Sequence, residues 1–323
     1  MRRRIRVIAF LLVGVAGLGA PAGAADPALP EWAYPVNPAG LQPAPDDGRP
    51  RKVPNSSAAF TLTQIRDLFK APDWHPDAHA PMPEIVAIGR KPGVFACGYC
   101  HLPNGLGRPE NSSLAGLPAQ YIERQVADFS SGARRSSEPR SLPINFMTAV
   151  AKAATQAEVR IAAEYFASLK PQPWIRVVEA EQVPKTHVSG WMLVASEPVE
   201  LEPIGQRIVE MPEDLERTEL RDASTGFVAY VPPGSIARGE ALVSRGGDGK
   251  TIACSICHGP GLRGLGQVPA LAGRSPSYIV RQLWDMQRGA RTGPWVELMK
   301  AVVARLTIDD MVAIAAYTAS RAP

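Results

Sequence analysis

The sequence predicts a mostly α-helical protein, in which two tandem copies of one helical unit are joined by a small β-rich insert. Three observations support this fold class. A cysteine pair followed by histidine occurs twice, as CGYCH at Cys97–His101 and as CSICH at 254–258. Helix-forming segments that follow the first motif recur after the second. Short runs rich in β-branched and aromatic residues lie between the copies.

The repeat becomes visible when Cys97 is aligned with Cys254. Two stretches then match: residues 113–134 on 270–291 without a gap and, after five extra residues in the first copy, residues 147–168 on 299–320. Apolar spacing and capping residues predict a helix in each stretch. The chain therefore contains an internal duplication that includes both cysteine motifs.

The first 24 residues have the layout of a secretory signal peptide: four arginines, an apolar run at 7–18 and small residues up to Ala24. An uncleaved anchor is the alternative, although the run is short for a bilayer span. Residues 1–24 contain four arginines and no acidic residue. Cleavage therefore reduces the 35 basic residues to 31 and leaves the 31 acidic residues unchanged. The balance gives no basic surface for nucleic acid. We expect a periplasmic protein with no stable membrane span after cleavage.

The predicted organisation has four parts after the signal peptide: a Pro-rich arm at 25–57, a first unit at 58–170, a β-rich insert at 171–234 and a second unit at 235–323. Trp32 and Tyr34 are candidates for holding the arm against the body. The insert is expected to be a small β module or a linker that covers the junction of the units.

The units are expected to share a helical plan. The first helix of the first unit is predicted at 61–70, with residues 235–247 as its counterpart. The C-terminal helices, at 156–169 and 308–320, have an apolar face at helical spacing. We expect each of them to cross the first helix of its own unit.

The two cysteine motifs indicate covalent haem attachment. Two cysteines three positions apart can each form a thioether to a haem vinyl group, and the adjacent histidine can bind the iron. A thioredoxin-like redox pair, half of a zinc site and a local disulfide are the alternatives for one pair alone. The histidine at the fifth position of both motifs, in a chain with an export signal, favours two covalently bound haem c groups.

The second axial ligand is expected to be methionine. Met147 in the first copy aligns with Met299 in the second. Met286 and Met311 lie inside apolar-periodic helices, where methionine usually fills the core. His75, His79 and His187 have no repeat counterpart, and the Pro-rich surroundings of the first two indicate a surface loop.

These motifs, with a Tyr-Ile-x-x-Gln helix, a Gly-Ala-Arg segment, a later methionine and a terminal Ala-Ala-x-Tyr helix, resemble the dihaem cytochromes c4. The resemblance implies two class I cytochrome c domains. It assigns Cys97, Cys100, His101 and Met147 to one haem, and Cys254, Cys257, His258 and Met299 to the other. It also places Tyr121, Arg134, Tyr278 and Arg291 near the haems, at the propionates. Leu102, in place of a glycine, and the insert depart from the family pattern.

The resemblance implies an electron carrier and not an enzyme, with a membrane respiratory complex or a periplasmic dehydrogenase as redox partner. A cytochrome subunit permanently docked on an oxidoreductase is the alternative. A dihaem peroxidase would need one iron with an open position, and the matched methionines give no sign of that asymmetry. Because every expected ligand lies in the repeats, deletion of residues 172–231 is expected to leave both haem sites intact.

Overall fold

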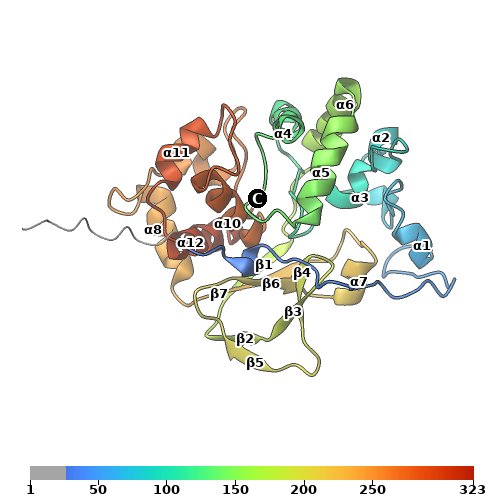
Figure 1. Cartoon of the computed structure of the whole chain (residues 1–323), viewed down its shortest axis with the longest axis horizontal. Helices are drawn as coiled ribbons and strands as arrows, with labels where there is room; N and C mark the ends of the chain where they lie inside the picture. Colours follow the sequence, from blue (N-terminus) through green and yellow to red (C-terminus); the bar gives the residue numbers. More distant parts are fainter. Residues whose placement is uncertain (1–26) are drawn as a thin grey trace, which may run out of the picture.

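The computed structural model describes residues 27–323, so the predicted signal peptide lies outside the described residues. Two groups of helices stand side by side above a set of short strands (Figure 1). The first group contains α1 (Leu62–Ile65), α2 (Glu84–Ala87), α3 (Cys97–His101), α4 (Ala119–Ser131), α5 (Leu142–Ala153) and α6 (Gln156–Ser168). The second group contains α8 (Ser235–Arg245), α9 (Ser255–His258), α10 (Pro276–Gln287), α11 (Glu297–Val303) and α12 (Ile308–Ala319). The mostly helical fold class is confirmed.

The C-terminal helix of each copy begins at a matched capping box. Thr155 and Thr307 each accept a hydrogen bond from the backbone N–H three residues later, which satisfies an otherwise unpaired donor of the first turn. In the second copy α12 crosses α8, as expected. The helices approach so closely that a Cβ added to Gly239 would lie 2.0 Å from the Ala313 carbonyl oxygen.

The prediction for the first helix of the first unit is wrong in two respects. The helix is shorter than the predicted 61–70, and residues 235–247 are not its repeat counterpart. The helix α1 ends at Ile65 because the Asp67 carboxylate accepts a hydrogen bond from the Phe69 N–H, a local turn that competes with the helix. The offset that aligns Cys97 with Cys254 places α8 over residues 78–88, which contain α2 and two prolines. The prolines restrict helix formation there, and the short α2, at the position equivalent to α8, contacts α6.

The insert contains seven short strands, so its predicted β-rich character is present in the structure. The strands are β1 (Ile175–Glu179), β2 (Gln182–Pro184), β3 (Thr186–Ser189), β4 (Met192–Ala195), β5 (Leu201–Pro203), β6 (Val209–Pro212) and β7 (Phe227–Val231), with α7 (Leu215–Glu219) between the last two. One sheet has the order β1-β7-β6, in which β1 and β7 are parallel and β7 and β6 antiparallel. The pairs β2-β5 and β3-β4 are antiparallel.

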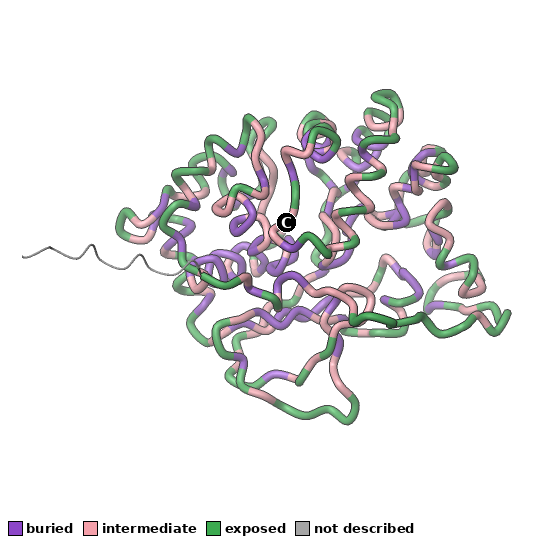
Figure 2. The backbone as a smooth tube through the Cα atoms, viewed as in Figure 1, coloured by how far each residue is buried: buried purple, intermediate pink, exposed green. Residues whose placement is uncertain are grey.

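The β1-β7-β6 sheet joins the cores of the two helix groups. Phe227 of β7 packs with the apolar residues of the first group, whereas Ala229 and Val231 of the same strand pack with those of the second. Buried residues are concentrated along α10, α12 and the strands beneath them, and the loops at the lower edge are exposed (Figure 2). The insert therefore covers the junction of the copies and contributes to both cores.

The N-terminal arm is attached to the second helix group through an aromatic residue. Tyr34 is 5% exposed, and its hydroxyl donates a 2.7 Å hydrogen bond to the Asp285 carboxylate. Burial, with the nearby Asp285 charge, raises the pKa of Tyr34. Trp32 packs against the same core, so both residues hold the arm as the sequence suggested.

Candidate functional site

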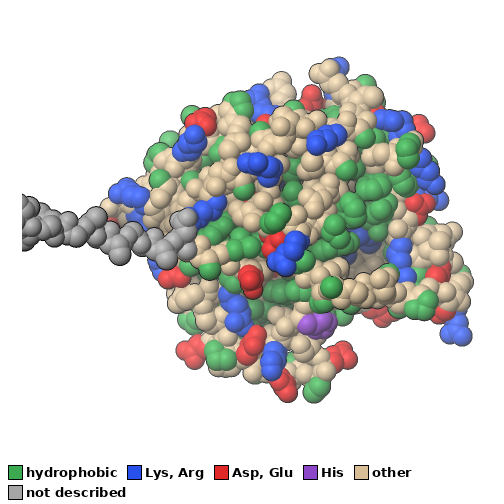
Figure 3. Space-filling view, viewed as in Figure 1, with side chains coloured by type: hydrophobic (Ala, Val, Ile, Leu, Met, Phe, Trp, Pro, Cys, Tyr) green, Lys and Arg blue, Asp and Glu red, His purple; other side chains and the backbone are tan. Residues whose placement is uncertain are grey.

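The first cysteine motif lies at the wall of a large apolar cavity. The helix α3 carries the motif, and the cavity has a volume of about 190 Å³, against about 10 Å³ for a second pocket. Four of its lining residues are those predicted to hold the first haem: Cys97, Cys100, His101 and Met147. Figure 3 shows apolar side chains gathered over the region of α3 and α5, next to a hollow in the surface. The structure thus brings the first predicted ligand set to one cavity.

The protonation state of the histidine fits iron binding. Burial lowers the pKa of the His101 imidazole to about 4, so the ring is neutral near pH 7. A neutral imidazole is the form that binds a metal. The four cysteines are free thiols, and the apolar lining suits a macrocycle that must be shielded from water.

Both histidines are oriented by a backbone carbonyl eleven residues later. The Nδ1–H of His101 donates to the Ser112 carbonyl oxygen at 2.8 Å, and that of His258 donates to the Pro269 carbonyl oxygen at 2.7 Å. A hydrogen bond of this kind fixes the tautomer and leaves Nε2 with its lone pair for iron. The sequence prediction did not include these carbonyls, although the fixed repeat offset relates them.

The residues predicted to hold the second haem lie in a different environment. Cys254 and Met299 pack against the core of the second helix group. His258 is 9% exposed, and burial lowers its pKa. Cys257 is exposed at the surface. The assignment of these residues to the second haem stays a prediction.

The predicted tyrosine and arginine residues form a reciprocal network between the copies. Arg134 donates to the Tyr278 hydroxyl at 2.8 Å and to Gln282 at 3.1 Å. Arg291, its repeat partner, donates to the Tyr121 hydroxyl at 3.1 Å and to Gln125 at 2.8 Å. Each arginine also donates to the glutamine of its own copy at 2.9 Å. The network has approximate twofold symmetry and fixes the two copies against each other.

This network lies beside the first cavity, because Tyr121, Gln125, Arg134, Tyr278 and Gln282 line it. Although burial opposes the shift, the positive charges of Arg134 and Arg291 lower the pKa of Tyr278 to about 8. Two buried guanidinium groups next to the cavity provide donors suited to carboxylates. The propionate role of the Tyr and Arg residues remains a prediction, and the two glutamines are additional members that the sequence interpretation missed.

The residue after each motif must adopt a backbone conformation that favours glycine. Leu102 has φ 61° and ψ 155°, and Gly259 at the equivalent position has φ 77° and ψ 170°. For a residue with a side chain this region costs about 1–3 kcal/mol. Leu102, at 4% exposure, is held there by its surroundings, and the departure from the family pattern is therefore a site of strain.

The insert also takes part in the first site, contrary to the expectation that it can be removed. Trp191 and Arg221 of the insert line the first cavity. The Arg221 guanidinium donates to the Tyr99 carbonyl oxygen, inside the CGYCH motif, at 2.8 Å. Removing residues 172–231 would open this wall and expose the apolar partners of Phe227 in the first core.

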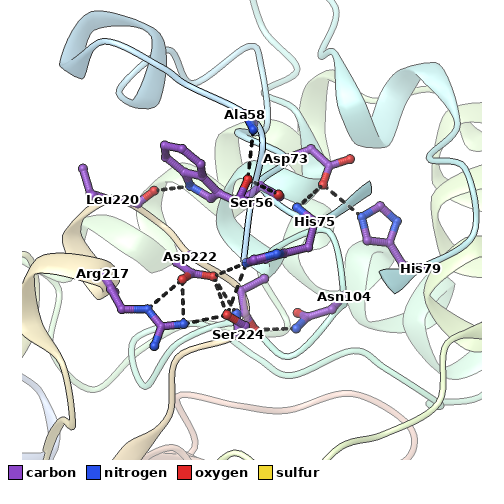
Figure 4. Close-up of polar contacts among 12 residues, drawn as sticks. Ser56, Ala58, Asp73, His75, His79, Asn104, Arg217, Leu220, Asp222 and Ser224 are labelled. Carbon is purple, nitrogen blue, oxygen red and sulfur yellow. Dashed lines mark hydrogen bonds and ion pairs between the residues drawn. The ribbon is translucent and has the colours of Figure 1, made fainter. Parts of the chain in front are cut away.

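The other histidines have structural partners outside the cavity lining. His75 Nε2 lies 2.9 Å from the Asp222 carboxylate, and His79 Nε2 lies 3.1 Å from that of Asp73 (Figure 4). Its hydrogen bond to Asp73 raises the pKa of His79. His187 pairs with Val194 in the β3-β4 ladder. Within residues 27–323, no group of three or more His, Cys, Asp and Glu side chains is arranged to hold a metal ion.

Comparisons with known proteins identify distant relatives over most of the chain. No family model matches. The thiosulfate dehydrogenase electron acceptor of Thiomonas intermedia is 29% identical, covering 71% of this chain and 80% of the relative. Cytochrome c4 of Azotobacter vinelandii is 26% identical, covering 74% of this chain and 90% of the relative. Each match therefore extends over more than one of the predicted units.

Among solved structures, cytochrome c4 of Acidithiobacillus ferrooxidans is 22% identical with a TM-score of 0.46, covering 69% of this chain and 98% of that one. A thiosulfate dehydrogenase of Marichromatium purpuratum is 27% identical with a TM-score of 0.48, covering 80% of this chain and 40% of that one. The two CxxCH motifs and the sequence relationship together imply two covalently bound haem c groups.

Proposed function

We propose that this chain, a distant member of the dihaem cytochrome family that includes cytochromes c4 and thiosulfate dehydrogenase electron acceptors, is an exported electron carrier. The observation that supports this function most strongly is the first cavity, where two cysteines, a histidine and a methionine meet in an apolar lining. Two cysteines, a histidine and a methionine also occupy the matching repeat positions in the second copy.

Each residue set has a separable task. The bound haem iron supplies a one-electron couple between the ferrous and ferric states. The cysteines anchor the group, and the carbonyls of Ser112 and Pro269 orient the histidines. The apolar lining would exclude water from a bound haem, and Met147 or Met299 as an iron ligand would favour a comparatively high potential because the thioether is a weak donor.

We infer that the electron donor is a periplasmic dehydrogenase, with thiosulfate dehydrogenase as the first candidate. Relatives from Thiomonas intermedia and Stutzerimonas stutzeri are named as electron acceptors of that enzyme. A membrane respiratory complex is then a suitable recipient of the electrons. No helix within residues 27–323 is long and apolar enough to cross a membrane.

The partner assignment is tested by mixing the oxidised protein with thiosulfate dehydrogenase and thiosulfate. We expect both haems to be reduced within the turnover time of the enzyme, with no reduction when thiosulfate or the enzyme is omitted. An unreduced protein under conditions in which a known acceptor is reduced would contradict this partner and leave the electron-carrier function to be tested with other donors.

A permanently docked subunit is the second candidate function. Val199, in the connection before β5, and Leu201, the first residue of β5, are each 64% exposed, and exposed apolar side chains of this kind occur at protein interfaces. Purification from the native host in low salt distinguishes the two states. A carrier elutes alone, whereas a docked subunit elutes with its dehydrogenase in a constant ratio.

A further inference from the structure

The segment of the insert from α7 to Ser224 lies against the outside of the first haem motif. Its Arg221 is 9% exposed and lines the first cavity. The guanidinium carbon lies 3.8 Å from the centre of the Tyr99 ring, in addition to the hydrogen bond to the Tyr99 carbonyl. Tyr99 is one of the two residues between Cys97 and Cys100, so a positive charge contacts the motif itself.

Neighbouring contacts fix this segment in place. The Asp222 carboxylate is bound by His75 at 2.9 Å and by Arg217 at 2.8 Å (Figure 4). Trp74 donates its indole N–H to the Leu220 carbonyl at 2.8 Å. The backbone on both sides of Arg221 is thereby anchored to a loop of the first copy, and the guanidinium has little freedom to leave the motif.

The buried charges around the first motif do not cancel. Arg108 pairs with Glu110 through an Nε to Oε1 hydrogen bond of 2.6 Å, and both side chains are buried. Glu110 also lines the cavity. This pair is neutral as a unit, so Arg221 contributes one net positive charge. Burial and the nearby Arg108 lower the pKa of Arg221, as expected for a cation that lacks full compensation.

The second copy has none of these groups at its equivalent positions. Ile256 takes the place of Tyr99, Leu265 that of Arg108 and Gln267 that of Glu110. The insert has no repeat counterpart, and Arg221 contacts the first motif. The electrostatic surroundings of the two motifs therefore differ although their ligand sets match.

We propose that Arg221, a residue of the insert, raises the reduction potential of the first haem. The proposal rests on the proposed function, because it requires a haem at each motif. The ferric group carries one more positive charge than the ferrous group. A buried guanidinium beside it disfavours the ferric state, and the interaction is strong because the surroundings screen it poorly. Electrons are thereby favoured on the first haem, and Arg221 acts as a tuning residue.

Redox titration of the whole two-haem protein tests this, with the haem methyl NMR signals resolving the two haems. We expect Arg221→Gln to shift the ferric-to-ferrous equilibrium of the first haem toward ferric by at least tenfold, which is about 59 mV for one electron. Arg221→Lys keeps the charge and should retain most of the wild-type potential. The second haem serves as the internal reference and should shift far less.

Glu110→Gln supplies a test with the opposite sign and a milder structural change. The amide can keep the contact that Glu110 Oε1 makes with Arg108 while the compensating negative charge is lost, so the potential of the first haem should rise. If the Arg221→Gln protein fails to incorporate the first haem, the potential of the first haem in Glu110→Gln is measured instead. The proposal is overturned if the reduction potential of the first haem is unchanged in Arg221→Gln or falls in Glu110→Gln. It is also overturned if Arg221→Lys shifts that potential as much as Arg221→Gln does. None of these outcomes depends on the redox partner.

Discussion

The two CxxCH motifs occupy equivalent positions in two copies of one repeat, but the chain around them differs. Tyr99 in the first motif is 6% exposed beneath Arg221, whereas Ile256 at the same position in the second motif is 67% exposed. The contacts that orient the histidine are the same in both. The groups predicted to hold a haem thus recur in both copies, while an unrepeated insert makes the surroundings of the two sites different.

The difference between the two motifs is tested most strongly by removing the part of the insert that covers the first motif. We expect replacement of residues 219–222 by Gly-Ser-Gly-Ser to abolish stable haem incorporation in the first copy, because Leu220 and Arg221 contribute to its packing. Intact mass after export should then show one haem. The same replacement at residues 196–199, in the β4-β5 connection, should leave two. Two haems in both variants would mean that the cover is dispensable.

The residue after the motif gives a second comparison of the copies. A Cβ added to Gly259 would lie 2.4 Å from the Gly264 carbonyl oxygen, so Gly259→Ala should lower the free energy of unfolding by at least about 2 kcal/mol through clash and backbone strain. Leu102→Gly relieves backbone strain of about 1–3 kcal/mol but loses a buried side chain whose burial contributes about 1.5–3 kcal/mol, so the two effects largely offset each other. We therefore expect a net change within about 1 kcal/mol.

Guanidinium unfolding of the two variants and the wild type, each with both haems bound, measures the difference. A Leu102→Gly variant that is destabilised as strongly as Gly259→Ala would show that the Leu102 side chain, and not the backbone conformation, dominates at the first motif.

The exposed second motif leads to a smaller, kinetic prediction. If partners exchange electrons where the motif is accessible, Ile256→Asp should reduce the second-order rate of reduction by thiosulfate dehydrogenase several-fold, since it places an unpaired charge at the centre of the contact. Ile161→Asp on α6, where the native side chain is 45% exposed, is the matched control. Stopped-flow reduction provides both rates. Equal rates for the two variants would place the exchange elsewhere.

Features of the fold that depend on residues close together in the sequence were predictable, whereas features that depend on residues far apart in the sequence were not. The helices α4 and α10 and the capped helices α6 and α12 were predictable, because apolar spacing and capping groups are local signals. The repeat then extended these predictions from one copy to the other. The helix predicted at 61–70 was wrong because a turn at Asp67 ends it after Ile65.

The candidate site was predictable where residue type and spacing encode the chemistry. The Cys, His and Met residues that motif spacing and repeat position assign to the first haem line one cavity. Arg221 could not be found in this way, because it lies 122 positions from its partner Tyr99 and no repeat marks it. The reciprocal arginine network was missed as an interface, since contacts between copies leave no periodic signal in either.

The most direct measurement of the central claim, an electron carrier with methionine on both irons, is the near-infrared sulfur-to-iron band of the ferric protein. We predict a band strength that fits two methionine ligands, with about half lost in Met147→Ala and in Met299→Ala. Each variant should also gain a high-spin signal and bind an added small ligand at one iron. A wild type that already contains one high-spin haem, or a band unaffected by either substitution, would contradict the account and favour a haem with an open position.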